Sequence, residues 1–386
     1  MNKVKSWNAA LLPVLFGFFI MGFVDVVNLS TSYVKADFSL NDKTANLLPM
    51  MVFFWFAVCS LPVGKLMNKI GRKSTVLISA AVTIVAMVLP LISYTFPVVL
   101  AAFALLGIGN TILQVSLNPL LTDVVSGDRT TSMLTLGQFI KAISSTLGPV
   151  IISAAVGLFG NWKMVFPIYA TLTAASLLWL ALTPVKETAQ VAQGDGKQVR
   201  KLLSDPYIIM LFFAILLSVG FEIGLMTTVP KYMTEKFGIS LEDAGLGCSL
   251  YYIARTIGTF LGSILLVRFR PESFLKVTVA AGVAALVIFS LGNNQAVLLV
   301  CLFLVGLFCA NIFAIVFSAA MNAHRDMSND VSALMIMGVA GGALIPPLLG
   351  IVSDAMGQWA SLVALVVVLA GILAISFLIK KDTLKK

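Results

Sequence analysis

The stretch Leu134–Pro149, LTLGQFIKAISSTLGP, places a lysine inside a segment that otherwise has the composition of a helix crossing a lipid bilayer. An ammonium near the centre of a bilayer costs about 3 kcal/mol or more, so Lys141 is expected to face a water-filled cavity, a carboxylate or a ligand. Gln138 precedes it by three residues, which on a helix puts the amide and the ammonium on one face. We predict that this helix forms one wall of a central polar cavity.

The composition of the whole chain is that of an integral membrane protein. Its 386 residues are 59% hydrophobic and 11% charged, whereas a soluble domain carries about 25% charged residues. The first apolar run is too long for a signal peptide and has no small-residue cleavage pattern, so we expect it to be the first span. With about 20 apolar residues per span, the sequence predicts twelve transmembrane helices, centred near residues 22, 55, 84, 110, 144, 172, 219, 254, 283, 309, 342 and 369.

The positive charges are distributed unevenly between the two sides of the predicted membrane. The net charge is +9, with 26 Lys and Arg residues against 17 Asp and Glu residues. Of the 26, nineteen fall on the side of the termini, two lie within spans (Lys141 and Arg255), and five lie on the other side: Lys35, Lys43, Lys163, Lys231 and Lys236. Because basic loops stay in the cytoplasm, we expect both termini and the middle loop to be cytoplasmic. This placement also argues against a nucleic-acid partner.

A single polar linker divides the predicted helices into two sets of six. Residues 1–183 are expected to form an N-terminal six-helix bundle, residues 184–206 a cytoplasmic linker, and residues 207–386 a C-terminal six-helix bundle. A shift of 198 residues takes Gly22-Phe23 to Gly220-Phe221, Gly64 to Gly262, and Pro149 to Pro347. These matches indicate a duplicated unit with parallel halves, as in transporters whose substrate lies between the repeats near the membrane midplane.

Four charged residues lie within the predicted spans, and polar residues share helical faces with three of them or with one another. Helical spacing pairs Asp25 with Asn28, Gln138 with Lys141, Tyr252 with Arg255, and Gln114 with Asn118. Amides and tyrosines suit the recognition of sugar hydroxyls, and the two cations suit a carboxylic substrate. We therefore predict Asp25 and Glu222 as ion-coupling residues. The predicted substrate-binding residues are Asn28, Gln114, Asn118, Gln138, Lys141, Tyr252 and Arg255.

A purely structural role for these charges is the alternative. Two ion pairs could neutralise all four, and Glu222 with Arg255, on consecutive spans, is the most natural pair. Lys141 could then pair with Asp25. A functional role is favoured for Lys141, because ionisable groups inside a membrane usually act in function. For Arg255 both interpretations stay open.

The first short loop on the basic side, Gly64 to Lys73, reads GKLMNKIGRK. Its glycines allow a tight turn, and its basic residues can interact with the carboxyl ends of helices. This loop resembles that of the major facilitator superfamily, in which a glycine, an acid, an arginine, a glycine and two basic residues recur at this spacing. Asn68 stands where the family has the acid, so the loop lacks the family's own carboxylate.

The resemblance extends to the fucose:proton symporter family of sugar transporters. Gly338–Gly350, GVAGGALIPPLLG, is similar to the glycine- and proline-rich eleventh span of that family. GFVDVVN from Gly22 is similar to its first span, and GFE from Gly220 to its seventh. Asn118-Pro119 and Gln138 match its fourth and fifth spans. The resemblance implies the superfamily fold and sugar transport.

The chain departs from that family at the charged positions. Leu29 stands where the family has its proton-linked aspartate, with Asp25 one turn earlier, and Gln114 replaces a glutamate. Lys141 stands where an asparagine would accompany Gln138, and Thr259 takes the place of an arginine, with Arg255 one turn before it. The family's carboxylate pair therefore does not carry over to this chain.

Two other classes of function are the alternatives to a sugar transporter. Drug exporters of the superfamily carry a Gly-x-x-x-Gly-Pro-x-x-Gly-Gly signature in the fifth span. Here Gly148-Pro149 is present, but Ser144 and Ile152-Ser153 replace the other glycines. A membrane enzyme or sensor would need a metal cluster, a nucleophile with its base, or a soluble domain, and the sequence shows none of these patterns.

The sequence therefore predicts a secondary active transporter that imports a monosaccharide or an acidic sugar derivative by alternating access. The coupling ion would be H⁺ or Na⁺, and the alternatives are an exporter of drugs or other small organic solutes and an ion-independent uniporter. We expect no enzyme activity, no cofactor and no metal site. The protein is expected to be a monomer in the bacterial inner membrane, with its four cysteines as buried thiols.

Overall fold

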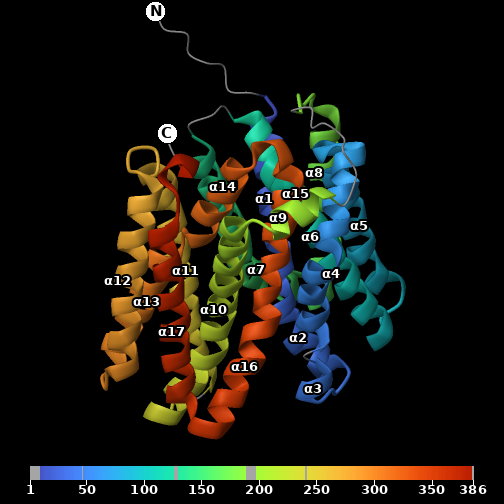
Figure 1. The fold of residues 1–386 in the computed structure, drawn as a ribbon. Coiled ribbons are helices and arrows are strands. Elements are labelled where there is room, and N and C mark those ends of the chain that lie inside the picture. Colours follow the sequence, from blue (N-terminus) through green and yellow to red (C-terminus); the bar gives the residue numbers. More distant parts are fainter. Residues whose placement is uncertain (1–8, 46, 126–128, 188–196, 240, 385–386) are drawn as a thin grey trace, which may run out of the picture.

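The protein is a bundle of long helices that run side by side (Figure 1). The computed structural model describes residues 9–45, 47–125, 129–187, 197–239 and 241–384. Within these residues, eleven helical spans are long and apolar enough to cross a membrane. Helix α11 (Leu241–Leu265) is not one of the eleven, but it packs in the bundle against α7 and α13. With α11 the described chain has the twelve spans that the sequence predicts, and the all-α prediction is confirmed.

The first six spans alternate in direction, as successive helices joined by short loops do. A one-turn helix, α3 (Asp42–Ala45), and a 3-10 turn, η3 (Trp162–Met164), lie in two of the loops. The spans are α1–η1–α2 (Leu11–Met21, Gly22–Asp25 and Val26–Asp37), α4 (Leu47–Ile70), α5 (Arg72–Ile92), α6 (Phe96–Val124), α7 (Thr130–Phe159) and α8 (Val165–Leu182).

The second six spans follow a short helix, α9 (Lys197–Leu203), which lies in the predicted linker. They are α10 (Pro206–Phe237), α11, α12 (Pro271–Leu291), α13–α14 (Gln295–Cys309 and Ile312–Ala323), η4–α15–η5–α16 (Arg325–Met327, Ser328–Met337, Gly338–Ala340 and Gly341–Met356) and α17 (Gln358–Leu378), followed by η6 (Lys381–Leu384). Helix α1 begins and α17 ends at the same end of the bundle, where α8 also ends and α10 begins (Figure 1). We call this end the linker side.

Local sequence sets where α10 begins and ends. Pro206 occupies the first turn, where no intrahelical N–H bond is lost, and Asp205 caps the helix by accepting the Tyr207 N–H at 2.9 Å. Gly238 ends the helix with φ +66°, a conformation that favours glycine. Asp205 also lies 2.8 Å from His324. Burial raises the pKa of the Asp205 carboxyl, but its hydrogen bonds with His324 and the Tyr207 N–H bring it below the ordinary value.

Two spans are interrupted near their middles by 3-10 turns, one at Gly22–Asp25 and one at Gly338–Ala340. The first interruption lies where the chain comes very close to α7. A Cβ atom at Gly22 would lie 2.6 Å from the Lys141 carbonyl oxygen and 2.7 Å from the Ser144 Cβ, so only glycine fits. The break therefore holds the first span against α7 beside Lys141.

The second half repeats this close approach at the position that the 198-residue shift assigns. A Cβ atom at Gly220 would lie 3.0 Å from the Gly341 carbonyl oxygen and 2.8 Å from the Ile345 Cβ. Gly220 therefore allows the close approach of α10 and α16, as Gly22 allows that of the first span and α7. The first–fifth and seventh–eleventh spans pack in equivalent ways, as the predicted repeat requires.

The outer surface of the bundle is apolar. Large side chains such as Phe54, Leu178, Val277 and Val367 are exposed on helices of both halves. On a soluble protein such surfaces would be unfavourable, but on a helix of membrane-spanning length they face lipid.

Candidate functional site

Asp25 lies at the break in the first span, where its carboxylate faces α7. It accepts a hydrogen bond from Ser145 Oγ at 2.5 Å. Ser145 comes one helical turn after Lys141 on α7. The break, the serine and the lysine are therefore placed together by the contact at Gly22 described above.

The ammonium of Lys141 lies among three other charged groups. The charges that act on it are those of Asp25, Arg255 and Glu222. Within the part of the chain whose side chains are described, it makes no hydrogen bond and no ion pair within 4 Å. Lys141 is therefore a cation near the middle of a span whose charge is balanced only at longer range.

Glu222 and Arg255 form the ion pair that the sequence favoured. Arg255 Nη1 lies 2.8 Å from Glu222 Oε1, between α11 and α10, and the two side chains are 21% and 18% exposed. Tyr252 and Tyr251 precede Arg255, with ring centroids 5.7 Å apart in an edge-to-face arrangement. The pair holds the seventh and eighth spans together at the level of the other charges.

The four predicted charged residues are thus brought into one cluster, which we call the charged site: Asp25, Lys141, Glu222 and Arg255. Two come from the first half of the chain and two from the second, and each acts electrostatically on others across the bundle. Two carboxylates face two cations, so the cluster is neutral when all four are ionised. Such a cluster between two halves is the arrangement in which transporters bind substrates and ions.

Gln138 is the polar neighbour that remains available to a ligand. Its side chain is half-buried, and no hydrogen bond to it is found within the described side chains. Tyr252 is also half-buried. The side chain of Asn28 lies outside those that the structure describes.

Gln114 and Asn118 are placed differently. Both are buried, and both hydrogen-bond within α6, since Gln114 Nε2 donates to Asn110 Oδ1 at 2.7 Å and Asn118 Nδ2 donates to the Gln114 carbonyl at 2.7 Å. Asn110 in turn donates to the Met21 carbonyl at 2.9 Å. These amides support the break in the first span, and their predicted contact with substrate stays a prediction.

Two residues near the site were not predicted. Tyr169 stacks on Phe23 with ring centroids 3.9 Å apart, and its buried hydroxyl, which senses the charge of Asp25, has no hydrogen-bond partner within the described residues. Asn110 was missed although it lies four residues before Gln114. The spacing Asn110, Gln114, Asn118 is a visible polar stripe, whereas nothing in the sequence marks Tyr169 among the apolar residues of α8.

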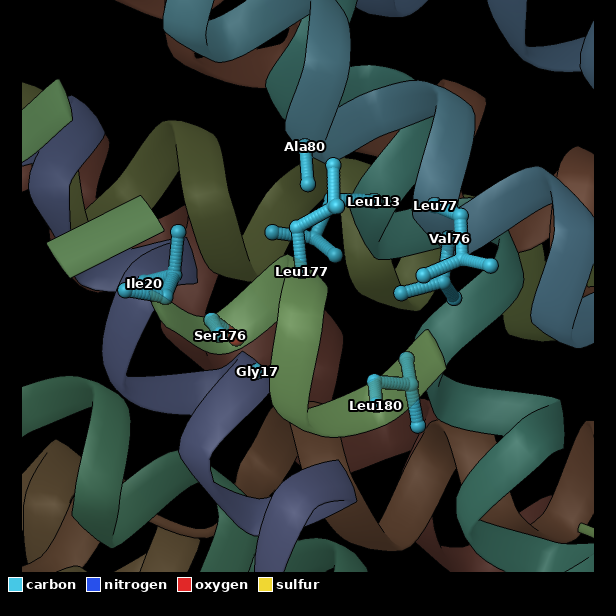
Figure 2. A pocket seen from close by; sticks show the side chains of 9 residues that line it. All are labelled: Gly17, Ile20, Val76, Leu77, Ala80, Leu113, Ser176, Leu177 and Leu180. Atoms are coloured by element: carbon cyan, nitrogen blue, oxygen red, sulfur yellow. The ribbon is translucent and has the colours of Figure 1, made fainter. Parts of the chain in front are cut away.

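Figure 2 shows a pocket that lies elsewhere. It is enclosed by α1, α5, α6 and α8, and only a serine interrupts its apolar lining of Gly17, Ile20, Val76, Leu77, Ala80, Leu113, Ser176, Leu177 and Leu180. None of the four charged residues lines it. The pocket is a packing gap inside the first half and not the charged site.

On the linker side the two halves are fastened together by Arg72. Its guanidinium lies 2.6 Å from Asp123 and donates to Asn329 Oδ1 at 2.8 Å and Ser328 Oγ at 2.5 Å. The Arg72 and Asp123 side chains are 4% and 2% exposed. The arginine of the loop thus bridges α6 and the start of α15.

Asn68 completes this fastening with a carboxylate from the other half. Its amide nitrogen lies 3.1 and 3.3 Å from the two carboxylate oxygens of Asp330, and Asn329 Nδ2 donates to Asn68 Oδ1 at 2.8 Å. The acid absent from the loop is therefore supplied by α15. The sequence did not predict this, because the partner lies 262 residues away.

All side-chain hydrogen bonds found between the halves within the described residues lie on the linker-side half of the bundle. Besides those of Asn68 and Arg72, they are Thr131–Ser318, Ser132–Ser263 and Ser332–Val115. These contacts hold the helices of the two halves together on the linker side.

Comparison with known proteins agrees with this architecture. The model of the Major Facilitator Superfamily matches residues 14–335 and 211–386. The glucose/galactose transporter of Brucella abortus biovar 1 is 24% identical over 373 residues, 92% of this chain and 90% of that protein. The multidrug resistance protein MdtL of Escherichia fergusonii is 24% identical over 302 residues, 78% of this chain and 76% of that protein.

A solved structure shares the fold over its whole length. The major facilitator superfamily transporter FucP in its outward conformation superposes with a TM-score of 0.82 at 18% identity, covering 96% of this chain and 99% of that one. At this identity the likeness concerns the fold.

Proposed function

Because the chain belongs to the Major Facilitator Superfamily, we propose that it is a secondary transporter that imports a monosaccharide or an acidic sugar derivative. The relatives that it matches are membrane transporters and not enzymes. The observation that carries the proposal is the charged site, formed by residues of both halves near the middle of the spans.

The substrate class is supported by two independent features. The Brucella relative, which covers nine-tenths of both chains, is a glucose/galactose transporter. The site also offers the groups that bind sugars. Gln138 has an amide without a hydrogen bond among the described side chains, Tyr252 has an aromatic ring with a hydroxyl, and Lys141 has a cation for a carboxylate.

Alternating access follows from the contacts between the halves. If the linker side is cytoplasmic, as its basic residues indicate, the structure is fastened on the inside by Arg72 and Asn68. Substrate would enter the charged site from the outside, and rocking of the halves would break these contacts and release it inside. A bacterial inner membrane is the proposed location.

Asp25 is the better of the two candidates for the coupling ion. Glu222 is already neutralised by Arg255 at 2.8 Å, whereas Asp25 is held only by a serine hydroxyl within the described residues. A proton or Na⁺ at Asp25 would drive uptake, and facilitated diffusion without an ion is the alternative.

An exporter of drugs or other small organic solutes is the second candidate, suggested by the MdtL relative. Polyspecific export of apolar compounds needs a wide apolar cavity. Four charges at the meeting point of the halves are a poor match for that.

The test is uptake of radiolabelled glucose and galactose, glucuronate and galacturonate by cells that lack their own carriers for these compounds. Uptake of at least one compound should exceed that of vector controls. Gln138→Ala should reduce this uptake several-fold, while Gln358→Ala, at the start of α17 and outside the site, should not. Absence of uptake for all four, together with export of a cationic dye, would replace the proposal by the exporter.

A further inference from the structure

The charged site contains one pair of charges in contact and one pair apart. Glu222 and Arg255 neutralise each other at 2.8 Å. Asp25 accepts its hydrogen bond from Ser145 instead, and Lys141 makes none within the described side chains. The ammonium of Lys141 is therefore the one cation of the site that has no direct partner there.

Asp25 and Glu222 are the two carboxylates whose charges act favourably on Lys141, and of these Glu222 is already in contact with Arg255. A cation held inside a membrane-spanning bundle needs a compensating anion. While Asp25 is ionised, the four charges of the site sum to zero. When Asp25 is neutralised, by a proton or by a bound Na⁺, the sum becomes +1 and the excess charge lies on Lys141.

The surroundings of Asp25 are suited to holding a cation. Ser145 donates to Asp25, and the buried Tyr169 hydroxyl, which feels its charge, has no hydrogen-bond partner within the described residues. The buried hydroxyl of Ser144, also without a partner among those residues, packs against Gly22, three residues before Asp25. The charged groups that face it are Lys141 from α7, Glu222 from α10 and Arg255 from α11. Tyr169 is 1% exposed and Ser144 is 1% exposed, so their unused oxygens lie inside the protein.

Resting on the proposed transport function, we propose that the substrate is an anionic sugar whose carboxylate binds Lys141 and Gln138, and that cation binding at Asp25 and substrate binding at Lys141 favour each other. With only the cation bound, the site carries +1 and Lys141 lacks its compensating charge. With only the carboxylate bound, the site carries −1, and with both bound it is neutral. The coupling is reciprocal, as linkage requires. A neutral sugar gains no such benefit.

The experiment measures binding of matched pairs to the purified full-length protein in detergent. The pairs are glucose with glucuronate, galactose with galacturonate, and mannose with mannuronate, by titration calorimetry. The conditions are about pH 5.5 and about pH 8, where uronates stay ionised, each with and without about 100 mM NaCl at constant ionic strength. At least one acid should bind roughly tenfold or more tightly than its neutral partner, the difference expected of a charge-assisted hydrogen bond. A rise in this preference at low pH identifies the proton, and a rise with NaCl identifies Na⁺.

Three variants separate the two sites. Lys141→Asn should abolish the preference for the acid while the neutral sugar binds as before, and Lys141→Arg should keep it. Asp25→Asn fixes the site at +1, so the acid should bind tightly at both pH values and with or without Na⁺. Lys276→Asn, which removes a lysine from α12 outside the site, should change neither property.

The outcomes are distinct. If sugars bind but the acid has no advantage, or keeps its advantage in Lys141→Asn, the inference is overturned while the transport function stands. If the acid is preferred but its affinity for the wild-type protein changes neither with pH nor with NaCl, the coupling is overturned. If none of the six compounds binds, the proposed function falls and the inference falls with it.

Discussion

The contact between Glu222 and Arg255 shows how far single residues could be interpreted from the sequence alone. The sequence offered their pairing as the structural alternative to roles in binding and ion coupling, because opposite charges on consecutive spans have few other ways to be neutralised. The hydrogen bond that Gln114 donates to Asn110 within α6 could not be predicted, because Asn110 lies on the same helical face as the expected ligand. Helical spacing gives the face of a side chain but not what meets it.

The first prediction concerns this pair. Glu222→Gln or Arg255→Gln should each lower stability by about 2 kcal/mol or more, because each leaves the other charge unpaired in a largely buried place. The double variant Glu222→Gln/Arg255→Gln should recover most of the loss, since it removes both charges. Thermal unfolding in detergent gives the three values and their coupling.

A control distinguishes a structural pair from a binding residue. Arg268→Gln removes an arginine from the turn that follows α11, outside the charged site, and it should change the unfolding temperature less than Arg255→Gln does. If the double variant is as unstable as the sum of the single ones, the two residues do not stabilise the protein through each other.

At the level of the helices, the loop between α4 and α5 lacks the acid of the superfamily's loop motif, and another helix supplies a carboxylate in its place. Asn68 was expected to leave the loop without its carboxylate, yet Asp330 from α15 provides one at 3.1 Å. A hydrogen bond between an amide and a carboxylate on the linker side can form whichever of the two helices carries the carboxylate, since each group needs only a complementary partner.

The second prediction concerns this contact. Asn68→Asp would set two carboxylates about 3 Å apart, which disfavours the state closed on the linker side by roughly 2 kcal/mol. The double variant Asn68→Asp/Asp330→Asn restores one amide and one carboxylate and should restore the closed state. Distances between spin labels at Arg129→Cys and Arg270→Cys, one on each half, report opening as a longer population in the single variant only.

Two results would contradict this view of the interface. A distance distribution unchanged by Asn68→Asp would show that the contact does not influence the equilibrium. Opening that persists in the double variant would show that the effect of Asn68→Asp is not one of charge. Asp330→Asn alone keeps a hydrogen-bonding group and should open the linker side less than Asn68→Asp does.

Across the whole molecule, the sequence predicted what depends on regular patterns. The twelve spans and the repeat are both regular features, and the equivalent contacts at Gly22 and Gly220 follow from the repeat. The 3-10 breaks at Gly22–Asp25 and Gly338–Ala340 were not predicted, because a glycine permits a break in a helix without requiring one. The Tyr169 hydroxyl near Asp25 arises from packing of distant spans, which no local pattern records.

The last prediction concerns the orientation of the molecule in the membrane. The sequence assigns nineteen of its 26 basic residues to the side of the termini and the linker, and basic loops stay in the cytoplasm. In a variant without native cysteines, Gln193→Cys in the linker, outside the described residues, should react with a membrane-impermeant maleimide only after the cells are opened. Asn161→Cys, exposed in the loop between α7 and η3 at the opposite end, should react in intact cells. Labelling of Gln193→Cys in intact cells would reverse the orientation, and the closed end would then face outward. The contacts of Arg72 and Asn68 would then hold the halves together on the outer side, and the proposed direction of transport would lose its structural support.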